Sequence, residues 1–229
     1  MHLVMFDIDG TLTETMKIDE QCFVCSLAEI YGFTAVETDW SKYKHTTDSG
    51  IFHEIHMARA GRLPSDAEVS HFQQHFIALL RCASSESAFA PVKGARQLLS
   101  ALSASAKYRV SIATGGWRDS ARLKMASAGM CFDDHPAASA DDAHDRESIM
   151  KIALQRAVEG HGTPFASTVY VGDGVWDARA CRNLGIPFIG IGSGERATRL
   201  ASEGAVCTFQ NYSDADIFLE ALDQITQSV

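Results

Sequence analysis

The chain opens with a short apolar segment that runs directly into two carboxylates. Residues His2 to Phe6 are largely apolar and read as a buried strand, and Asp7-Ile8-Asp9-Gly10-Thr11 follows at its carboxyl end. Open α/β sheets place their active sites at the carboxyl ends of the strands, so a nucleophile is expected here. Two neighbouring carboxylates would repel each other in a dry cleft unless a cation lay between them. The pair therefore predicts a site for a hard divalent metal ion, with an ordinary acidic glycine turn as the alternative.

The composition fits a globular protein and argues against several classes of partner. With 229 residues, of which 46% are hydrophobic, the chain can build a sizeable core for one large domain or two small ones. Its net charge of −9 argues against nucleic acid as a partner, because nucleic-acid-binding proteins usually present a basic face. No apolar run approaches the roughly 18 residues of a membrane span. We therefore expect a cytoplasmic protein that binds neither nucleic acid nor membrane, with its six irregularly spaced cysteines reduced.

Two kinds of pattern divide the chain. After Thr13 the apolar spacing becomes helical and stays helical until about Phe89, without a convincing strand. From Pro91 onward strand patterns and helix patterns alternate, which is typical of a parallel sheet wrapped by helices. Strands are expected at 108–113, 168–171 and 186–191, and helices at 94–104, 118–128, 148–159, after Asp177 and at 216–225.

These patterns predict an α/β fold in two parts. The core is expected to be a Rossmann-like parallel sheet with helices on both faces, formed by residues 1–13 and 89–229. A smaller all-helical cap domain, residues 14–88, is inserted directly after the first strand. Because the insertion begins at the carboxyl end of that strand, it should overhang the active site.

A second strand delivers a hydroxyl group and unhindered backbone amides to the same edge of the sheet. The segment 110–113 ends in Thr114-Gly115-Gly116, and a helix is expected to begin near Arg118. Amides at a helix N-terminus favour an anion. Thr114 and Gly115 are therefore candidates for binding a phosphoryl oxygen, with a simple turn as the alternative.

A third strand carries a further pair of carboxylates. The apolar segment 169–171 and Gly172 lead into Asp173, and Asp177 follows one helical turn later. Asp173 can complete a site of oxygen ligands around a metal. Two roles stay open for Asp177, which can hold a metal-bound water or cap the helix.

A cation is needed to offset the charge of the nucleophile and of a phosphoryl group. Arg146 follows the acidic segment 141–145 and stands near a helix start. Lys151 is the competing candidate, but it lies five positions further on, about 140° around the helix, so both side chains cannot easily face one site. We favour Arg146, and the alternative for either residue is a solvated surface charge.

Together these segments resemble the four motifs of the haloacid dehalogenase-like hydrolase superfamily. The order and approximate spacing match Asp7-x-Asp9-Gly10-Thr11, Thr114, a basic residue at 146 and Gly172-Asp173-Gly174-x-x-Asp177. The helical insertion resembles the C1 cap of members similar to phosphoglycolate phosphatase and β-phosphoglucomutase. One departure is that the third motif more often has lysine. Arginine keeps the charge and adds a bidentate grip on phosphate.

The resemblance implies a magnesium-dependent phosphatase acting on a small phosphorylated metabolite. Asp7 would attack phosphorus and form an aspartyl-phosphate. Asp9 would protonate the leaving oxygen and then deprotonate the attacking water. Thr114, Gly115 and Arg146 would bind the phosphoryl oxygens. The implied metal ligands are Asp7, the backbone carbonyl of Asp9, Asp173 and, in support, Asp177.

Two alternatives share these motifs. A sugar-phosphate mutase of the β-phosphoglucomutase type would differ only in cap residues that exclude water. A catalytically inactive phosphate-binding module is less favoured, because the nucleophile and the metal acids are all present. The resemblance also implies that Asp9 favours phosphate esters, since related dehalogenases and phosphonoacetaldehyde hydrolases lack an aspartate there. The expected partner is a small-molecule phosphate ester, and the chain is expected to be a monomer or a homodimer.

Overall fold

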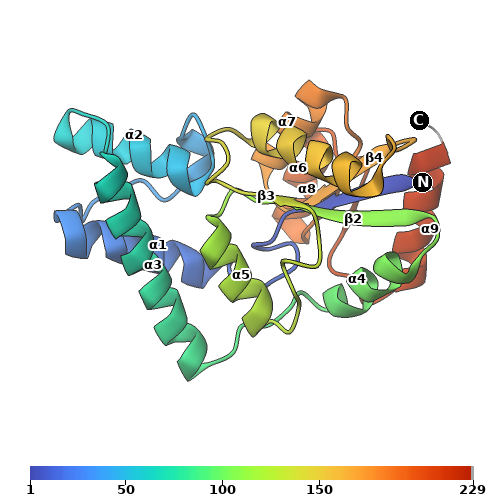
Figure 1. The fold of residues 1–229 in the computed structure, drawn as a ribbon, viewed down its shortest axis with the longest axis horizontal. Coiled ribbons are helices and arrows are strands. Elements are labelled where there is room, and N and C mark those ends of the chain that lie inside the picture. The colour runs from blue at the N-terminus through green and yellow to red at the C-terminus, as the bar shows by residue number, and fades with distance from the viewer. Residues whose placement is uncertain (228–229) are drawn as a thin grey trace.

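The computed structural model describes residues 1–227 and contains one parallel sheet with a helical insertion at one end (Figure 1). In this part of the chain the sheet has six strands in the order β3-β2-β1-β4-β5-β6, and every neighbouring pair is parallel. The strands are β1 His2–Phe6, β2 Tyr108–Ala113, β3 Ala137–Ala138, β4 Thr168–Gly172, β5 Phe188–Ile191 and β6 Cys207–Phe209.

The central position of β1 decides where the site forms. In the register of the sheet, Phe6 pairs with Ile112 of β2 on one side and with Val171 of β4 on the other. The residues that follow these three strands therefore leave the sheet together at one edge. Parallel strands place their carboxyl ends at the same edge, which is why segments far apart in the chain meet there.

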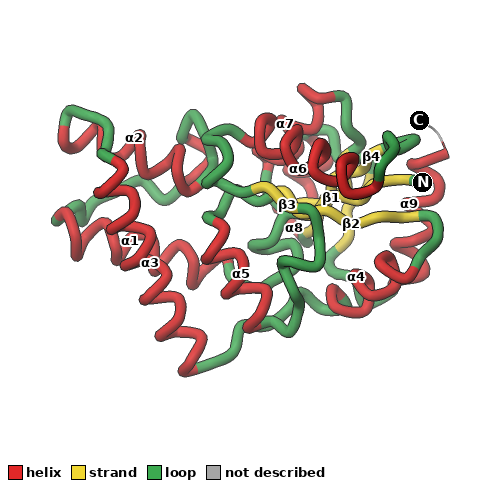
Figure 2. Tube along the Cα trace, viewed as in Figure 1, coloured by secondary structure: helices red, strands yellow, loops and turns green. Residues whose placement is uncertain are grey.

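Helices cover both faces of the sheet, and the insertion consists of helices joined by loops (Figure 2). The insertion contains α1 Met16–Tyr31, α2 Asp48–Ala60, α3 Asp66–Glu86 and a short 3-10 turn, Trp40–Lys42. The helices of the core are α4 Ala95–Ala104, α5 Arg118–Ser127, α6 Arg146–His161, α7 Val175–Leu184, α8 Gly194–Ser202 and α9 Ala215–Gln227.

Alternation along the strands builds two hydrophobic layers. Val4 and Phe6 of β1 belong to the cluster that contains buried residues of α4, α5 and α9. Leu3 and Met5 belong to the cluster on the other face, with buried residues of α6, α7 and α8. A strand whose residues are buried on both faces reads as a continuous apolar run, as β1 does. The expected Rossmann-like sheet with helices on both faces is confirmed.

The insertion has its own aromatic core, and the core domain contributes to it. Phe23 of α1, Phe52 of α2 and Phe72 of α3 are buried together, and the rings of Phe52 and Phe72 stack with centroids 4.4 Å apart. Trp117, which precedes α5, packs edge-on against Phe72 at 5.7 Å and stacks on Phe23 at 6.0 Å. The insertion and the core therefore share one continuous hydrophobic cluster.

Hydrogen bonds also tie the start of α2 to the core. Thr47 Oγ1 donates to the carbonyl of His144 at 2.7 Å, and Ser49 Oγ donates to the carbonyl of Ala140 at 2.7 Å. Asp48 accepts the backbone N–H of Trp117 through Oδ2 at 2.9 Å. These contacts hold the insertion down over the edge of the sheet where the strand ends meet.

Three elements of the structure, β3, β6 and α8, are not predicted by the sequence patterns. The strands β3 and β6 have two and three residues, which is too short for a periodic signal. The helix α8 begins at Gly194, inside a glycine-rich segment, and is not among the helices expected from the sequence. The strand β3 pairs with β2 and β6 pairs with β5, so each lies at an edge of the sheet beside a longer strand.

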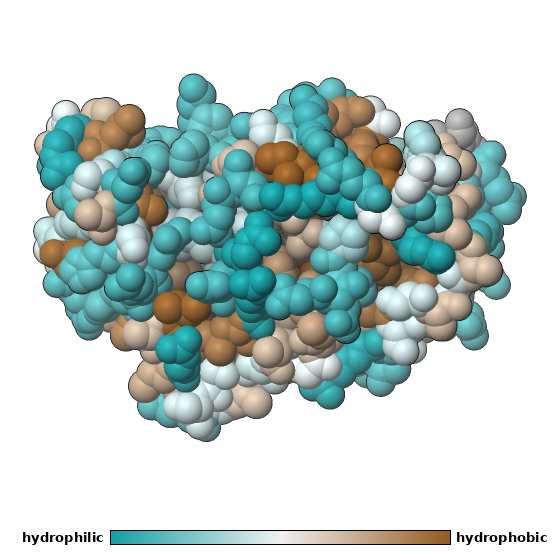
Figure 3. Space-filling model, viewed as in Figure 1, coloured by the Kyte–Doolittle hydropathy of each residue, from teal (hydrophilic) through white to brown (hydrophobic). Residues whose placement is uncertain are grey.

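The side of the molecule drawn in Figure 3 is mostly hydrophilic, with apolar residues gathered in small separate patches. None of the helices within residues 1–227 is both long enough and apolar enough to cross a bilayer.

We expect Phe72→Ala to destabilise the protein by about 3–5 kcal/mol, because it removes a fully buried ring and leaves a cavity between four aromatic neighbours. Urea unfolding followed by circular dichroism measures the change. Gln74→Ala, on the exposed side of the same helix, is the control and should change stability by no more than about 0.5 kcal/mol. A similar midpoint for both variants would mean that the insertion contributes little to the cooperative fold.

Candidate active site

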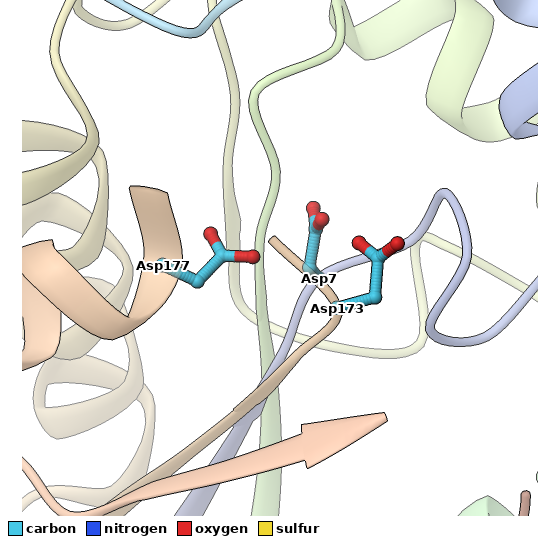
Figure 4. A group of neighbouring side chains, drawn as sticks. All are labelled: Asp7, Asp173 and Asp177. Carbon is cyan, nitrogen blue, oxygen red and sulfur yellow. The ribbon is translucent and has the colours of Figure 1, made fainter. Parts of the chain in front are cut away.

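Three buried carboxylates meet at the edge where β1 and β4 end (Figure 4). Asp7 directly follows β1, Asp173 directly follows β4, and Asp177 lies in the first turn of α7. One carboxylate oxygen of each residue lies within 4.8 Å of the others. Within residues 1–227, this is the one group of three or more such side chains close enough to hold a metal ion.

The electrostatics of this group favour a bound cation. Burial raises the pKa of Asp173 well above its ordinary value, and the charges of Asp7 and Asp177 raise it further. Burial likewise raises the pKa of Asp177 to about 7, although the nearby guanidinium of Arg146 opposes this shift. A hard divalent cation would remove the repulsion that these carboxylates exert on one another. The donor set, oxygen only and partly anionic, fits Mg²⁺.

Arg146 lies beside the nucleophile candidate. It is the first residue of α6 and is buried, with Nη1 3.3 Å from Oδ1 of Asp7 and 3.2 Å from Oδ1 of Asp177. Burial lowers the pKa of Arg146, but Asp177 and Asp7 outweigh that effect and raise it overall, so the side chain stays charged. Lys151, on the same helix, is exposed. Of the two cation candidates, the structure brings Arg146 to the carboxylates.

Gly115 gives Arg146 the space that it occupies. A Cβ atom at position 115 would lie 2.6 Å from Nη2 of Arg146, which is closer than non-bonded atoms approach. The hydroxyl of the preceding Thr114 is buried and accepts the N–H of Gly116 at 3.1 Å. Both residues line the same cavity as Asp7, so the second motif of the sequence does reach the first.

Asp177 also caps the N-terminus of α7, the helix to which it belongs. Its carboxylate accepts the N–H of Gly174 at 3.2 Å, at the start of α7, and the hydroxyl of Tyr170 at 3.4 Å. The sequence left open whether this residue caps the helix or supports a metal site. The structure shows the capping contact and also places Asp177 in the carboxylate group, so the same side chain is available for both.

The side chain of Asp9 does not belong to the group of three. Its Oδ1 accepts the hydroxyl of Thr15 at 2.6 Å, and its Oδ2 lies 2.6 Å from the ammonium of Lys124. The same ammonium donates to Oδ1 of Asp19 at 2.7 Å. The backbone carbonyl of Asp9 therefore stays as its candidate metal ligand, which is the ligand that the family resemblance implies.

Sequence reasoning missed Lys124 and Asp19, although a signal was present. Lys124 lies three residues after Ala121 and four before Ala128, both of which are buried. It therefore occupies the core-facing stripe of α5. Asp19 has the same relation to Phe23 on α1. A charged residue on the buried stripe of a helix is nearly always paired with an opposite charge. A lysine on one such stripe and an aspartate on another therefore predict an ion pair between the two helices.

A cavity of about 330 Å³ joins the strand ends to the insertion. At the strand ends it is lined by Asp7, Asp173, Thr114 and Arg146, and apolar side chains of the insertion and of the sheet region line it as well. Arg196, which the sequence did not single out, also lines it and donates to Oδ2 of Asp173 at 3.0 Å. The insertion contributes Met16, Lys17, Asp19, Glu20, Phe23, Trp40, Thr46, Thr47, Asp48 and Ile51.

We expect Gly10→Ala to destabilise the protein more than Gly32→Ala. Both glycines have a left-handed backbone, with φ of 72° and 71°, so each substitution should cost about 1–2 kcal/mol. A Cβ atom at position 10 would in addition overlap the carboxylate of Asp173 and lie 2.6 Å from Sδ of Met16, whereas nothing lies within 4 Å at position 32. Chemical unfolding should show a further loss of about 1–3 kcal/mol for Gly10→Ala. Equal losses would mean that the contact with Asp173 relaxes without cost.

Comparisons with known proteins show the family and the fold of the chain. A family model described as haloacid dehalogenase-like hydrolase matches residues 1–185. A search of curated proteins found no match. A solved hydrolase from Pseudomonas syringae is 19% identical with a TM-score of 0.74, covering 97% of this chain and 98% of that one.

Two further solved structures share the fold. CbbY from Rhodobacter sphaeroides, solved in complex with phosphate, is 16% identical with a TM-score of 0.69, over 93% of this chain and 95% of that one. A predicted phosphoglycolate phosphatase from Haemophilus somnus is 15% identical with a TM-score of 0.64, over 95% and 97%. At 15–19% identity these structures show a shared fold and nothing further. The family model covers most of the chain and shows the family. The chain therefore belongs to the haloacid dehalogenase-like hydrolases.

Proposed function

We propose that the protein is a magnesium-dependent phosphatase that hydrolyses a small phosphorylated metabolite through an aspartyl-phosphate. The observation that carries this proposal is the position of Asp7. Its carboxylate stands at the end of the central strand, beside two further carboxylates and a buried arginine, and it lines one cavity together with Asp173 and Arg146. That arrangement offers a nucleophile, oxygen ligands for a metal and a cation for phosphate in one place.

Asp7 is the proposed nucleophile. One of its oxygens attacks phosphorus, a new P–O bond forms, and the bond from phosphorus to the ester oxygen of the substrate breaks. Water then attacks the aspartyl-phosphate and releases inorganic phosphate, which restores the carboxylate. Splitting the displacement into two steps lets one cavity activate a carboxylate first and a water molecule second.

The other residues of the four motifs divide the remaining work. Asp9 gives a proton to the leaving oxygen in the first step and takes one from water in the second, a role that typically contributes about 10²–10⁴-fold in rate. Thr114, the amide of Gly115 and Arg146 bind the phosphoryl oxygens. The guanidinium of Arg146 is preorganised to bind a phosphoryl oxygen, because its contact with Asp177 already holds it beside Asp7.

The family generally uses a divalent metal, and the carboxylates here fit one. The residues that would hold it are Asp7, the backbone carbonyl of Asp9 and Asp173, with Asp177 in support. When bound, magnesium neutralises the charge that builds up as an anionic carboxylate approaches an anionic phosphate.

The insertion is proposed to select the substrate. We assign the cap to residues 14–88 and the catalytic core to residues 1–13 and 89–229. The cap supplies about half of the side chains that line the cavity, and 330 Å³ is at the small end of the usual range for ligand pockets. A small ester fits this space. The phosphate bound to CbbY and the phosphatase assignment of the Haemophilus somnus protein agree with a phosphate ester as its substrate class.

Hydrolysis of a panel of small phosphate esters should require Mg²⁺ and should be abolished by Asp7→Asn. The amide cannot form the acyl phosphate, and the metal is needed to bring two anions together. Release of inorganic phosphate, measured with added Mg²⁺ and with excess chelator, tests both statements. Asp216→Asn, an exposed aspartate on α9, is the matched control and should keep full activity. Turnover that resists the chelator, or that survives in Asp7→Asn, would contradict the mechanism.

A mutase with the same core would give different products. We expect free phosphate to accumulate in equal amount to the released alcohol, because the proposed second acceptor is water. Phosphorus NMR of a reaction with a hexose phosphate distinguishes the two outcomes. An isomerised sugar phosphate that accumulates in place of free phosphate would replace the phosphatase proposal with a β-phosphoglucomutase type of reaction.

A further inference from the structure

A buried lysine that no motif includes lies between two carboxylates and forms a charge triad with them. The ammonium of Lys124 on α5 contacts Oδ2 of Asp9 at 2.6 Å and Oδ1 of Asp19 at 2.7 Å. The lysine side chain is 0% exposed, while the side chain of Asp9 is 21% exposed and lines the cavity. Asp9 follows β1 in the core and Asp19 belongs to α1 in the insertion, so the triad spans both parts of the chain.

Lys124 itself is neither a nucleophile nor a phosphate ligand. Substrate cannot reach a side chain that is completely buried behind two carboxylates. Burial lowers the pKa of Lys124, but the carboxylates of Asp19 and Asp9 outweigh burial and raise it, so the amine keeps its proton and has no free electron pair. Any contribution to the reaction must therefore pass through a neighbour.

The neighbour with a proposed role is Asp9, and its carboxylate is held from both sides. Lys124 contacts one oxygen, and the hydroxyl of Thr15 donates to the other at 2.6 Å. The hydroxyl of Thr15 also shares a hydrogen bond with the hydroxyl of Thr13, at 2.5 Å. A carboxylate with a fixed donor on each oxygen has a fixed rotamer, and the part of Asp9 that remains exposed faces the cavity.

We propose that Lys124 is a positioning residue that fixes the carboxylate of Asp9 against the leaving group, with Asp19 of the insertion fixing Lys124 in turn. This inference rests on the proposed function, because it needs Asp9 to act as the acid in the first step. The acid would then be assembled by a contact between core and insertion, in addition to the four motifs of the core.

The chemistry of the leaving group separates a positioning role from a purely structural one. An alkoxide is a poor leaving group and needs a proton from a correctly placed acid, whereas p-nitrophenolate leaves without one. Loss of the position of Asp9 should therefore slow the first step for alkyl phosphates and spare it for p-nitrophenyl phosphate. General damage to the site would slow both substrates alike.

The test compares Lys124→Met with wild type in single-turnover reactions that measure release of the leaving group, with Mg²⁺ present. The substrates are p-nitrophenyl phosphate and whichever of glycerol 3-phosphate and glucose 6-phosphate the wild type hydrolyses faster. We expect release of the alcohol to slow at least about 100-fold and release of p-nitrophenolate to slow less than about fivefold. Lys151→Met, an exposed lysine on α6, is the matched control and should leave both rates unchanged.

A second variant and a binding measurement keep the test decisive. Lys124→Met leaves two carboxylates without their cation, so its fold is checked by calorimetric binding of inorganic phosphate with Mg²⁺, which should stay within about threefold of wild type. If Lys124→Met does not fold, Asp19→Asn provides the same comparison, because it releases the anchor of Lys124 and leaves the ammonium beside Asp9. Asp19→Asn should slow release of the alcohol by about tenfold and should again spare release of p-nitrophenolate.

Equal slowing of both substrates, or no slowing of the alkyl ester, overturns the role of Lys124. Failure of the proposed function gives a different result, since the wild-type protein would then release the leaving group from neither ester in the presence of Mg²⁺. The two failures can therefore be told apart in the same experiment.

Discussion

The structure depends on how buried negative charge is balanced where the central strands end. Asp7, Asp173 and Asp177 are brought within 4.8 Å of one another in an environment that excludes most water. Burying like charges together is costly unless cations or hydrogen bonds compensate them. Arg146 supplies part of that compensation from the first residue of α6, and a divalent metal would supply the rest. The arrangement is possible because parallel strands deliver their carboxyl ends to one edge.

A second charge balance joins the insertion to the core. Lys124 on α5 contacts one carboxylate from each part of the chain, and Trp117, which caps the start of the same helix, belongs to the shared aromatic cluster. Hydrogen bonds from the start of α2 to the core complete the junction. The helical insertion thus packs against the core, and residues of both parts line the cavity between them. The cavity is lined on one side by residues of the four motifs and on the other by side chains of the insertion.

Much of this could be predicted from the sequence, for reasons that are local. Strands β1, β2, β4 and β5 are apolar runs that end in polar or glycine residues, so both the strands and their tips can be recognised. The expected Arg146 and the carboxylates at 7, 173 and 177 do lie together. Strands β3 and β6 could not be recognised, because two or three residues carry no period and become strands only by pairing with a longer neighbour.

The sequence by itself determined which residues end the central strands, because apolar periodicity and the polar residues that interrupt it are properties of neighbouring positions in the chain. Only the tertiary structure decided which charged residues are buried and with what partner. Lys124 is 105 positions from Asp19 and 115 from Asp9, and Arg196 is 23 from Asp173. Such pairs follow from the packing of whole helices against the sheet, and their charges are stable in the interior only because that packing places opposite signs in contact.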